Sequence, residues 1–282
     1  MSVDRRSTML ALGTARYVTM SLIALVLLLP LIWLVVSSLR PPADIFAHGS
    51  RLGWSMLIPD RLTLENYTSL LGTGFPRAVG NSLFVALTTM VVGVVVNAAA
   101  GFAFAVFDFR FKNVIFAFVL AAAMMPFEAI VIPLYILVQS LGLIDTYAAL
   151  ILPDLANGFV IFMFRQFFAG LPRELYEAAR VDGASWGHIW LKIALPISWP
   201  VVLTGGIMLF MHQFEAFFWP LVATPSPEHT VVQVAIARNI SLEGTEWGRL
   251  FSSTTLAGLV ALVPFLLFQK FYIRNFVTSG LK

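Results

Sequence analysis

The sequence contains no cysteine and few charged residues. The lack of cysteine excludes disulfides, thiol catalysis and Cys-based metal sites. Charged residues make up only 12% of the chain, whereas hydrophobic residues make up 59%. A soluble domain carries about 25% charged residues, so this chain has too few charges to cover the surface of a soluble protein of its size. The composition therefore predicts an integral membrane protein.

The sequence also lacks the motifs of several protein classes. A P-loop ATPase needs Gly-Lys followed by Ser or Thr, and none of the four lysines follows a glycine. A net charge of +3 without a nucleic-acid motif is typical of basic loops that anchor a protein to an anionic membrane face. A membrane-embedded enzyme would need an acid and base pair, a metal cluster or a nucleophile triad at a workable spacing, and we find none. We therefore expect no catalytic residue, no metal, no cofactor bound by this chain and no nucleic-acid partner.

Long apolar runs separated by short polar segments predict an all-α integral membrane protein with about six transmembrane helices. We place these spans at residues 17–36, 81–107, 114–138, 147–168, 197–222 and 254–272. The first span has the roughly 20 residues that a bilayer demands, which favours a retained helix over a signal peptide. Prolines interrupt the third and fourth spans at Pro126, Pro133 and Pro153. We treat residues 1–282 as a single transmembrane domain with its core at about 81–275.

The segments between the spans predict the orientation. A loop at residues 40–78, with one short helix near 64–71, and a loop at 223–251 lie on one side of the predicted membrane. Both termini and a polar segment at 172–196 lie on the other side, together with twelve of the 18 Lys and Arg residues. The positive-inside rule therefore places the termini and the segment 172–196 in the cytoplasm.

Residues 172–196 form a polar island between two apolar spans, and we call this segment the finger. Pro172 and Glu174 suit the start of a helix, which we expect to run from about 172 to 181. Gly183 supplies the backbone freedom for a tight turn, and Ser185 is an expected N-cap for a second short helix that ends at Pro196. The finger is therefore predicted to be a helix-turn-helix.

Small and charged side chains on the finger indicate a docking surface. Ala178 and Ala179 are small enough to let another surface approach closely, and Glu177 and Arg180 offer charge at its edge. The alternative is an ordinary solvated loop, which a lone Glu-Ala-Ala would favour. The pattern is longer than that, because Glu-Ala-Ala is followed at fixed spacing by Gly183, Ile193, Leu195 and Pro196.

This full spacing resembles the signature loop of the membrane subunits of bacterial ABC importers. The residues that we expect to couple the chain to an ATPase are Glu177, Ala178, Ala179, Asp182, Gly183, Ile193, Leu195 and Pro196. Further runs resemble the sugar-transporter branch of that family: LENY at 64–67, NSL at 81–83, IPLY at 132–135, EAARVDGAS at 177–185 and GLK at 280–282. Together they are similar to the second permease subunit of importers for maltose-like oligosaccharides or glycerol phosphate.

The resemblance implies the ABC type I importer permease fold, with the finger as a cytoplasmic coupling loop between the fourth and fifth spans. It also implies that the chain is a non-catalytic subunit in a heterodimer with a second permease. Two ATPase subunits at the cytoplasmic face would use ATP and magnesium, and an external solute-binding protein would deliver the solute. In such a complex Glu177 meets a basic residue of the ATPase. The resemblance places the complex in the bacterial cytoplasmic membrane.

Polar side chains inside the predicted spans are candidates for the solute path, since each is costly when it faces lipid. They are Glu128, Asp154, Asn157, His212, Gln213 and Glu215. Each is alternatively a protonated carboxyl packed on a neighbouring helix or a polar pin between permease subunits. The three acids have no obvious intramembrane cation near them and would repel a phosphate, so we expect a neutral or amino sugar as the solute.

Two other functions remain open from the sequence. A glycerol-phosphate importer subunit belongs to the same branch. A secondary carrier driven by an ion gradient would use the intramembrane carboxylates as proton relays and would need no ATPase. The complete finger favours the ATPase-driven importer over the carrier.

Overall fold

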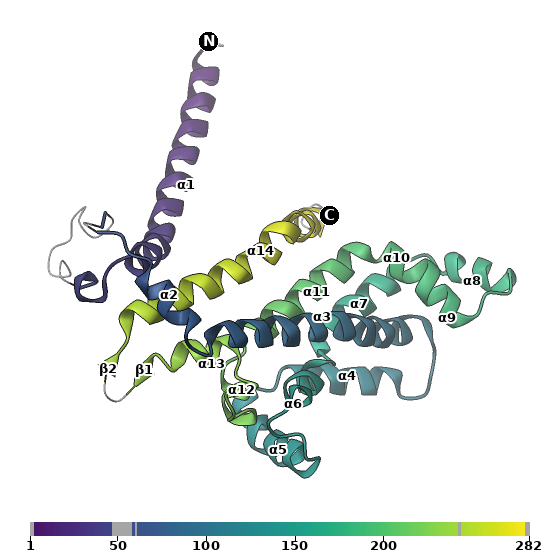
Figure 1. The fold of residues 1–282 in the computed structure, drawn as a ribbon. Coiled ribbons are helices and arrows are strands. Elements are labelled where there is room, and N and C mark those ends of the chain that lie inside the picture. Colours follow the sequence, from purple (N-terminus) through teal and green to yellow (C-terminus); the bar gives the residue numbers. More distant parts are fainter. Residues whose placement is uncertain (1–2, 47–57, 60, 242–243, 280–282) are drawn as a thin grey trace. The chain divides into compact units, whose positions relative to one another are not determined.

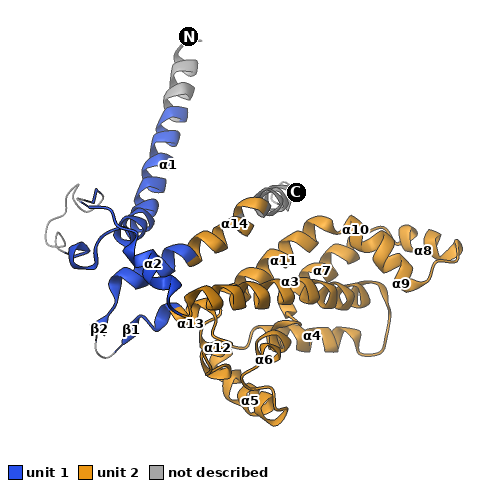
Figure 2. Cartoon of the chain, in the orientation of Figure 1, with its two compact units in different colours: residues 1–73, 236–256 blue, residues 74–235, 257–282 orange. Residues whose placement is uncertain are grey.

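The computed structural model describes residues 3–46, 58–59, 61–241 and 244–279. The run at 280–282, one of the marks of the sugar branch, lies outside the described residues. Contacts group the chain into two compact units (Figure 2). Unit 1 comprises residues 1–73 and 236–256, and unit 2 comprises residues 74–235 and 257–282. The expectation of a single domain stays a prediction.

Unit 1 is built around the end of the first helix. It contains α1 (Val3–Ser38), η1 (Pro42–Asp44), α2 (Glu65–Leu71), the antiparallel strands β1 (Ile240–Ser241) and β2 (Gly244–Thr245), and the start of α14 (Trp247–Ser279) (Figure 1). The buried side-chain amide of Asn66 donates hydrogen bonds to the carbonyl oxygens of Ser38 (2.8 Å) and Arg40 (2.7 Å). The first bond satisfies a carbonyl that the end of α1 leaves unpaired, and the second holds the residues that follow the helix. The observed α2 confirms the short helix expected near residues 64–71.

Unit 2 holds the long helix α3 and the helices that pack on it. Its elements are α3 (Phe75–Val106), α4 (Lys112–Ala123), α5 (Phe127–Ser140), α6 (Tyr147–Ile151), η3 (Leu152–Asp154), α7 (Gly158–Ala169), α8 (Arg173–Val181), α9 (Trp186–Ile189), the π-helical turn η4 (Trp190–Ala194), α10 (Leu195–Ile197), α11 (Trp199–Phe214) and α12 (Phe218–Ala223). Helix α13 (Val232–Ala237) crosses the boundary between the units. Helices α8 and α9 lie at the opposite end of unit 2 from α5, α6 and α12 (Figure 1).

The core of unit 2 forms where α3 packs against α7 and α11. Gly101 on α3 allows the closest approach, because a Cβ atom there would lie 2.5 Å from Cβ of Phe164 and 2.9 Å from the backbone nitrogen of Arg165. Small residues let membrane helices approach in this way. Phe164 and Phe168 on α7 are fully buried beside this contact and stack on each other. A small residue thus sets the distance between α3 and α7.

Two helices in the described part of the chain are long and apolar enough to cross a membrane, namely Gly13–Ser38 within α1 and Phe75–Val106. The number rises to five if each bent helix pair forms one span. The bends are 102° between α4 and α5, 42° between η3 and α7, and 83° between α10 and α11. The count of six spans stays a prediction.

Two expected boundaries are wrong in detail, and so is one expected interruption. Pro126 interrupts the third span as expected, because it has an extended backbone (ψ 137°) and lacks the N–H that would continue α4, but α5 runs through Pro133. The fifth span is shorter than expected, since α11 ends at Phe214 and α12 begins at Phe218. Pro196 does not end the second helix of the finger, because the helical backbone continues through α10 to Ile197.

Candidate functional site

The first helix of the finger, α8, has an inner and an outer face. Tyr176 and Ala179 are buried against α3 and α7, and the hydroxyl of Tyr176 donates a hydrogen bond to the carbonyl oxygen of Phe168 (3.3 Å). Burial raises the pKa of Tyr176 above its ordinary value. Glu177 and Ala178 are exposed on the opposite face. The helix confirms the predicted element, but Ala179 faces its own chain and offers no surface for a partner.

The turn of the finger has the hydrogen bonds of a Schellman motif. The N–H of Gly183 donates to the carbonyl oxygen of Arg180 (3.1 Å), and the N–H of Ala184 donates to that of Ala179 (2.9 Å). Gly183 has a φ of +83°, the left-handed conformation that this motif requires after a helix. Asp182 and Gly183 are both exposed at the tip. The turn therefore explains why a glycine stands at this position.

The second arm of the finger begins at the predicted cap and packs inward. The hydroxyl oxygen of Ser185 accepts a hydrogen bond from the N–H of His188 (3.3 Å), so Ser185 is the N-cap of α9. Ile189 and Ala194 are fully buried, and Ile193 and Leu195 are half-buried against the same core. Ile193 and Leu195 thus hold the finger to unit 2, while Pro196 is exposed.

A small cavity of about 200 Å³ lies where the finger meets the ends of α3 and α7. Its lining combines apolar residues with a basic and an acidic side chain: Ala105, Val106, Phe168, Ala169, Leu171, Arg173, Tyr176, Glu177 and Trp186. Glu177 therefore stands both on the exposed face of α8 and at this cavity. Glu177 is therefore an acidic residue at the edge of a partly aromatic recess.

Two of the six candidates for the solute path form a direct pair. Nε2 of His212 on α11 lies 3.5 Å from Oδ1 of Asp154 at the end of η3. The side chain of His212 is 59% exposed and that of Asp154 is 28% exposed in this chain. His212 is a cation only when protonated. The expectation that the acids have no cationic partner is therefore wrong for Asp154 when the imidazole carries a proton.

Two other candidates have structural partners. Oδ1 of Asn157 caps α7 by accepting hydrogen bonds from the N–H groups of Phe159 (3.1 Å) and Val160 (3.2 Å). The buried amide of Gln213 donates to the carbonyl oxygen of Leu150 (3.0 Å), while its Oε1 atom is buried without a partner in the structure. Asn157 thus acts as a helix cap, whereas the Oε1 atom of Gln213 is free to accept a hydrogen bond.

The remaining two candidates, Glu128 and Glu215, are exposed. Glu128 stands in the first turn of α5, where a negative charge suits the helix dipole, and Glu215 directly follows α11. Their exposure on a chain that lies in a membrane is consistent with a wet path or with a contact to another subunit.

Asn97 is a further important residue, which our sequence analysis missed. Its side chain is fully buried in α3 and donates hydrogen bonds to the carbonyl oxygens of Gly93 (2.6 Å) and Leu155 (2.8 Å). Its Oδ1 accepts a hydrogen bond from the N–H of Asn157 (2.8 Å). Asn97 thereby satisfies backbone groups at the break between η3 and α7. An asparagine inside a long apolar run was the signal that could have revealed it.

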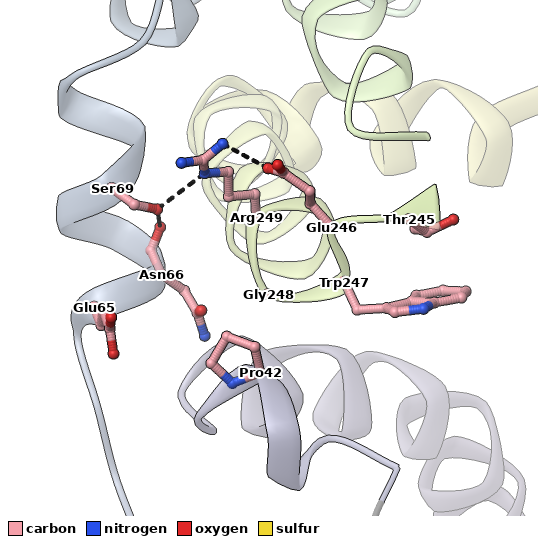
Figure 3. Close-up of a pocket in the computed structure, with 9 residues that line it drawn as sticks. All are labelled: Pro42, Glu65, Asn66, Ser69, Thr245, Glu246, Trp247, Gly248 and Arg249. Carbon is pink, nitrogen blue, oxygen red and sulfur yellow. Dashed lines mark hydrogen bonds and ion pairs between the residues drawn. The ribbon is translucent and has the colours of Figure 1, made fainter. Parts of the chain in front are cut away.

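Unit 1 contains a second cavity, of about 360 Å³, beside α2 and the start of α14 (Figure 3). It is lined by Pro42, Glu65, Asn66, Ser69, Thr245, Glu246, Trp247, Gly248 and Arg249. The guanidinium of Arg249 bonds to Glu246 and, through Nε, to Oγ of Ser69 (3.4 Å). These bonds link α14 to α2. The cavity contains none of the residues that the sequence singled out for coupling or for the solute path.

Residues 93–278 match the family model described as the inner membrane component of binding-protein-dependent transport systems. A relative from Halalkalibacterium halodurans, an arabinooligosaccharides transport system permease protein, is 30% identical over 99% of both chains. An sn-glycerol-3-phosphate transport system permease protein from Agrobacterium fabrum is 31% identical and aligns over 80% of this chain and 83% of its own. Among solved structures, a chain of a bacterial ABC transporter involved in the import of alginate is similar, with a TM-score of 0.80 and 20% identity over 96% of this chain and 98% of that chain.

Proposed function

Because the chain belongs to the family of inner membrane components of binding-protein-dependent transport systems, we propose that it is a permease subunit of an ATP-driven importer for a sugar. The observation that carries the sugar class is the alignment with the arabinooligosaccharide permease over 99% of both chains. The fold agrees, since a chain of the alginate importer is similar over nearly the whole length. The chain is a transporter subunit, and ATP is hydrolysed by separate subunits.

The finger is the element that docks on the ATPase. Its outer residues Glu177, Ala178 and Asp182 are available to a partner, and Glu177 meets a basic residue there. Its inner residues Ala179, Ile193 and Leu195 hold it to the helices of unit 2. Gly183 allows the tight turn, and the exposed Pro196 lies near the backbone connection between the finger and α11. ATP and magnesium are bound by the ATPase subunits.

The assembly follows from this role. The chain pairs with a second permease, with two ATPase subunits at the cytoplasmic face and with an external solute-binding protein. The distribution of Lys and Arg supports a cytoplasmic finger and cytoplasmic termini. Membrane lipid surrounds the helices that do not face the second permease.

Affinity purification tests the coupling role. The tagged chain is purified from its native membrane in mild detergent, and the proteins that come with it are identified by mass spectrometry. We expect a P-loop ATPase and a second permease with the wild type, and loss of the ATPase from a variant with Glu177→Ala and Gly183→Pro. A chain that comes out alone in both cases would instead support the ion-gradient carrier.

The solute path runs past the polar side chains of the spans, and Asp154 with His212 is its best-defined part. Glu128, Asn157, Gln213 and Glu215 are the other proposed members. A neutral or amino sugar suits a path with three carboxyl groups, because a phosphate would be repelled by any that are ionised. Asp154→Asn removes the charge with little change of shape, so it should alter solute preference and leave the ATPase attached.

A glycerol-phosphate importer is the second candidate, and the relative from Agrobacterium fabrum favours it. Uptake into proteoliposomes that contain the complete complex separates the two. Labelled arabino-oligosaccharide is offered with unlabelled sugars or glycerol phosphate as competitors. Competition by sugars supports the sugar importer, whereas strong competition by glycerol phosphate alone overturns it.

A further inference from the structure

The turn between α3 and α4 contacts the finger through a pair of aromatic rings. Phe107 directly follows α3, and its ring meets that of Trp186 edge to face, with centroids 5.0 Å apart and an interplanar angle of 84°. Such edge-to-face pairs are favourable beyond the area that they bury. Trp186 is the first residue of α9 and stands three residues after Gly183. The contact therefore attaches the finger to the end of α3 at a point near the tip of the finger.

The rings of Phe107 and Trp186 are each held in place by a neighbouring basic side chain. On the side of α3, Nζ of Lys112 donates a hydrogen bond to the carbonyl oxygen of Phe107 (2.7 Å) and lies 3.3 Å from Oδ1 of Asp108. The side chain of Lys112 is only 17% exposed. These bonds close the turn after α3 and fix the backbone that carries the Phe107 ring.

On the side of the finger, Arg180 clamps the other ring. Its guanidinium lies 5.3 Å from the centroid of Trp186, and its NH1 group donates a hydrogen bond to the carbonyl oxygen of Ala184 (2.8 Å). Arg180 thus bridges the end of α8 and the start of α9 across the turn. A guanidinium over an indole face is a favourable cation–π arrangement.

A third aromatic residue ties these parts to the core. The ring of Phe102 on α3 meets those of Phe107 (5.9 Å), Tyr176 (5.8 Å) and Phe168 (5.5 Å), all nearly edge to face. Tyr176 belongs to α8 and Trp186 to α9. Both arms of the finger are therefore linked by rings to the last turns of α3.

We propose that Trp186 and Phe107 form a joint that makes the finger move as one body with α3, so that Trp186, Phe107 and their supports Arg180 and Lys112 are positioning residues for coupled transport. This inference rests on the proposed function of the finger. The backbone joins the finger to the rest of unit 2 only at its base, through residues 170–171 and 197–198, and the helix bends by 83° at the second connection. A force applied at the tip would act on these two connections unless side-chain contacts nearer the tip transmit it to α3. Packed aromatic rings resist such sliding because interiors are close-packed and deform little.

Trp186→Ala tests the joint in complexes reconstituted with the second permease and the ATPase. We expect the ATPase to remain bound and to hydrolyse ATP at nearly the wild-type rate, while solute uptake per ATP falls by about tenfold, the size of effect seen for residues that carry coupling. Trp186→Phe keeps an aromatic edge and should restore most of the uptake. Trp199→Ala is the matched control, because Trp199 is also an exposed tryptophan but lies outside the joint at the start of α11.

Phe107→Ala examines the opposite side of the joint and must give the same uncoupling even if Trp186→Ala fails to assemble. The absence of natural cysteines also allows a distance measurement between spin labels at Val181→Cys and Asn113→Cys. Both sites are exposed, and Trp186→Ala should broaden their distance distribution. Normal uptake per ATP in Phe107→Ala or Trp186→Ala, or an unchanged distribution, would overturn the inference. A wild-type complex that takes up no sugar would instead overturn the proposed function.

Discussion

Gly183 allows the conformation of the finger turn to be tested separately from the space around it. Its φ of +83° lies in the left-handed region, and a Cβ atom added there would meet nothing within 4 Å. A substitution at Gly183 therefore changes the backbone energy without a clash. Alanine in this conformation costs about 1–2 kcal/mol, asparagine costs less, and a β-branched residue costs more.

This strain should appear as weaker docking of the ATPase. If relaxation of the turn moves the tip away from its docking geometry, the apparent dissociation constant rises by the inverse of the fraction of fingers that stay competent. A strain of about 1–2 kcal/mol corresponds to a rise of at most roughly 5-fold to 30-fold for Gly183→Ala. We expect a smaller rise for Gly183→Asn and a larger one for Gly183→Val.

The assay is binding of the purified ATPase to the permease pair in nanodiscs, measured by biolayer interferometry. Gly187→Ala is the matched control, since a Cβ at Gly187 also meets nothing within 4 Å and the residue lies inside α9. Alanine is favoured over glycine within a helix by about 1 kcal/mol, so this variant should bind as tightly as the wild type. Equal affinities for the wild type, Gly183→Ala and Gly183→Val would refute the reasoning, as would a loss in Gly187→Ala as large as that in Gly183→Ala.

Three further predictions concern stability and are measured by tryptophan fluorescence during thermal unfolding in detergent. Gly101→Ala should lower the melting temperature, because the added Cβ lies 2.5 Å from an atom fixed to the backbone of α7 and overpacking costs about 1–3 kcal/mol; Gly206→Ala, whose Cβ finds its nearest atom at an ordinary 3.5 Å, should not. Asn97→Leu should also lower it, since each buried polar group left unpaired costs about 1–3 kcal/mol, and an unchanged melting temperature would contradict the role of Asn97 at the break before α7. Asp145 in the loop before α6 has a pKa below its ordinary 3.8, mainly through a hydrogen bond with Ser226. Its contribution is therefore present above about pH 4 and lost as the pH falls toward the lower folded pKa, so the melting temperatures of the wild type and Asp145→Asn should converge in acid.

The finger could be predicted from the sequence because its shape depends on local hydrogen bonds. The N-cap at Ser185 and the left-handed glycine at Gly183 act on neighbours a few residues away. Residue type at those positions therefore carries the information directly. The direction in which Ala179 faces depends instead on the helices behind it, which the local pattern does not contain. The burial of Ala179 could therefore not be predicted from the motif.

The presence of long apolar helices could be predicted, but the bends between them could not. Three prolines interrupt the predicted third and fourth spans, yet α5 runs through Pro133, whereas the chain bends by 102° across the break that contains Pro126. A proline removes one hydrogen bond at either position. Whether the helix breaks depends on the partners available to the freed carbonyl groups, and these come from other helices.

Asn97 shows how such tertiary partners change the interpretation of a polar residue in a membrane span. Asn97 and Asn157 are both costly in lipid, and intramembrane polarity alone assigns them to a solute path. The side chain of Asn97 accepts a hydrogen bond from the backbone N–H of Asn157 and donates one to the carbonyl oxygen of Leu155, and the side chain of Asn157 caps α7. Both side chains thus satisfy the backbone where the helix is interrupted, which is a structural task. Asp154 at the same break pairs instead with the side chain of His212 on α11, and these two side chains are 28% and 59% exposed. Polar residues can therefore serve a break through hydrogen bonds to the backbone, and only the atoms that these bonds leave free can also serve a solute.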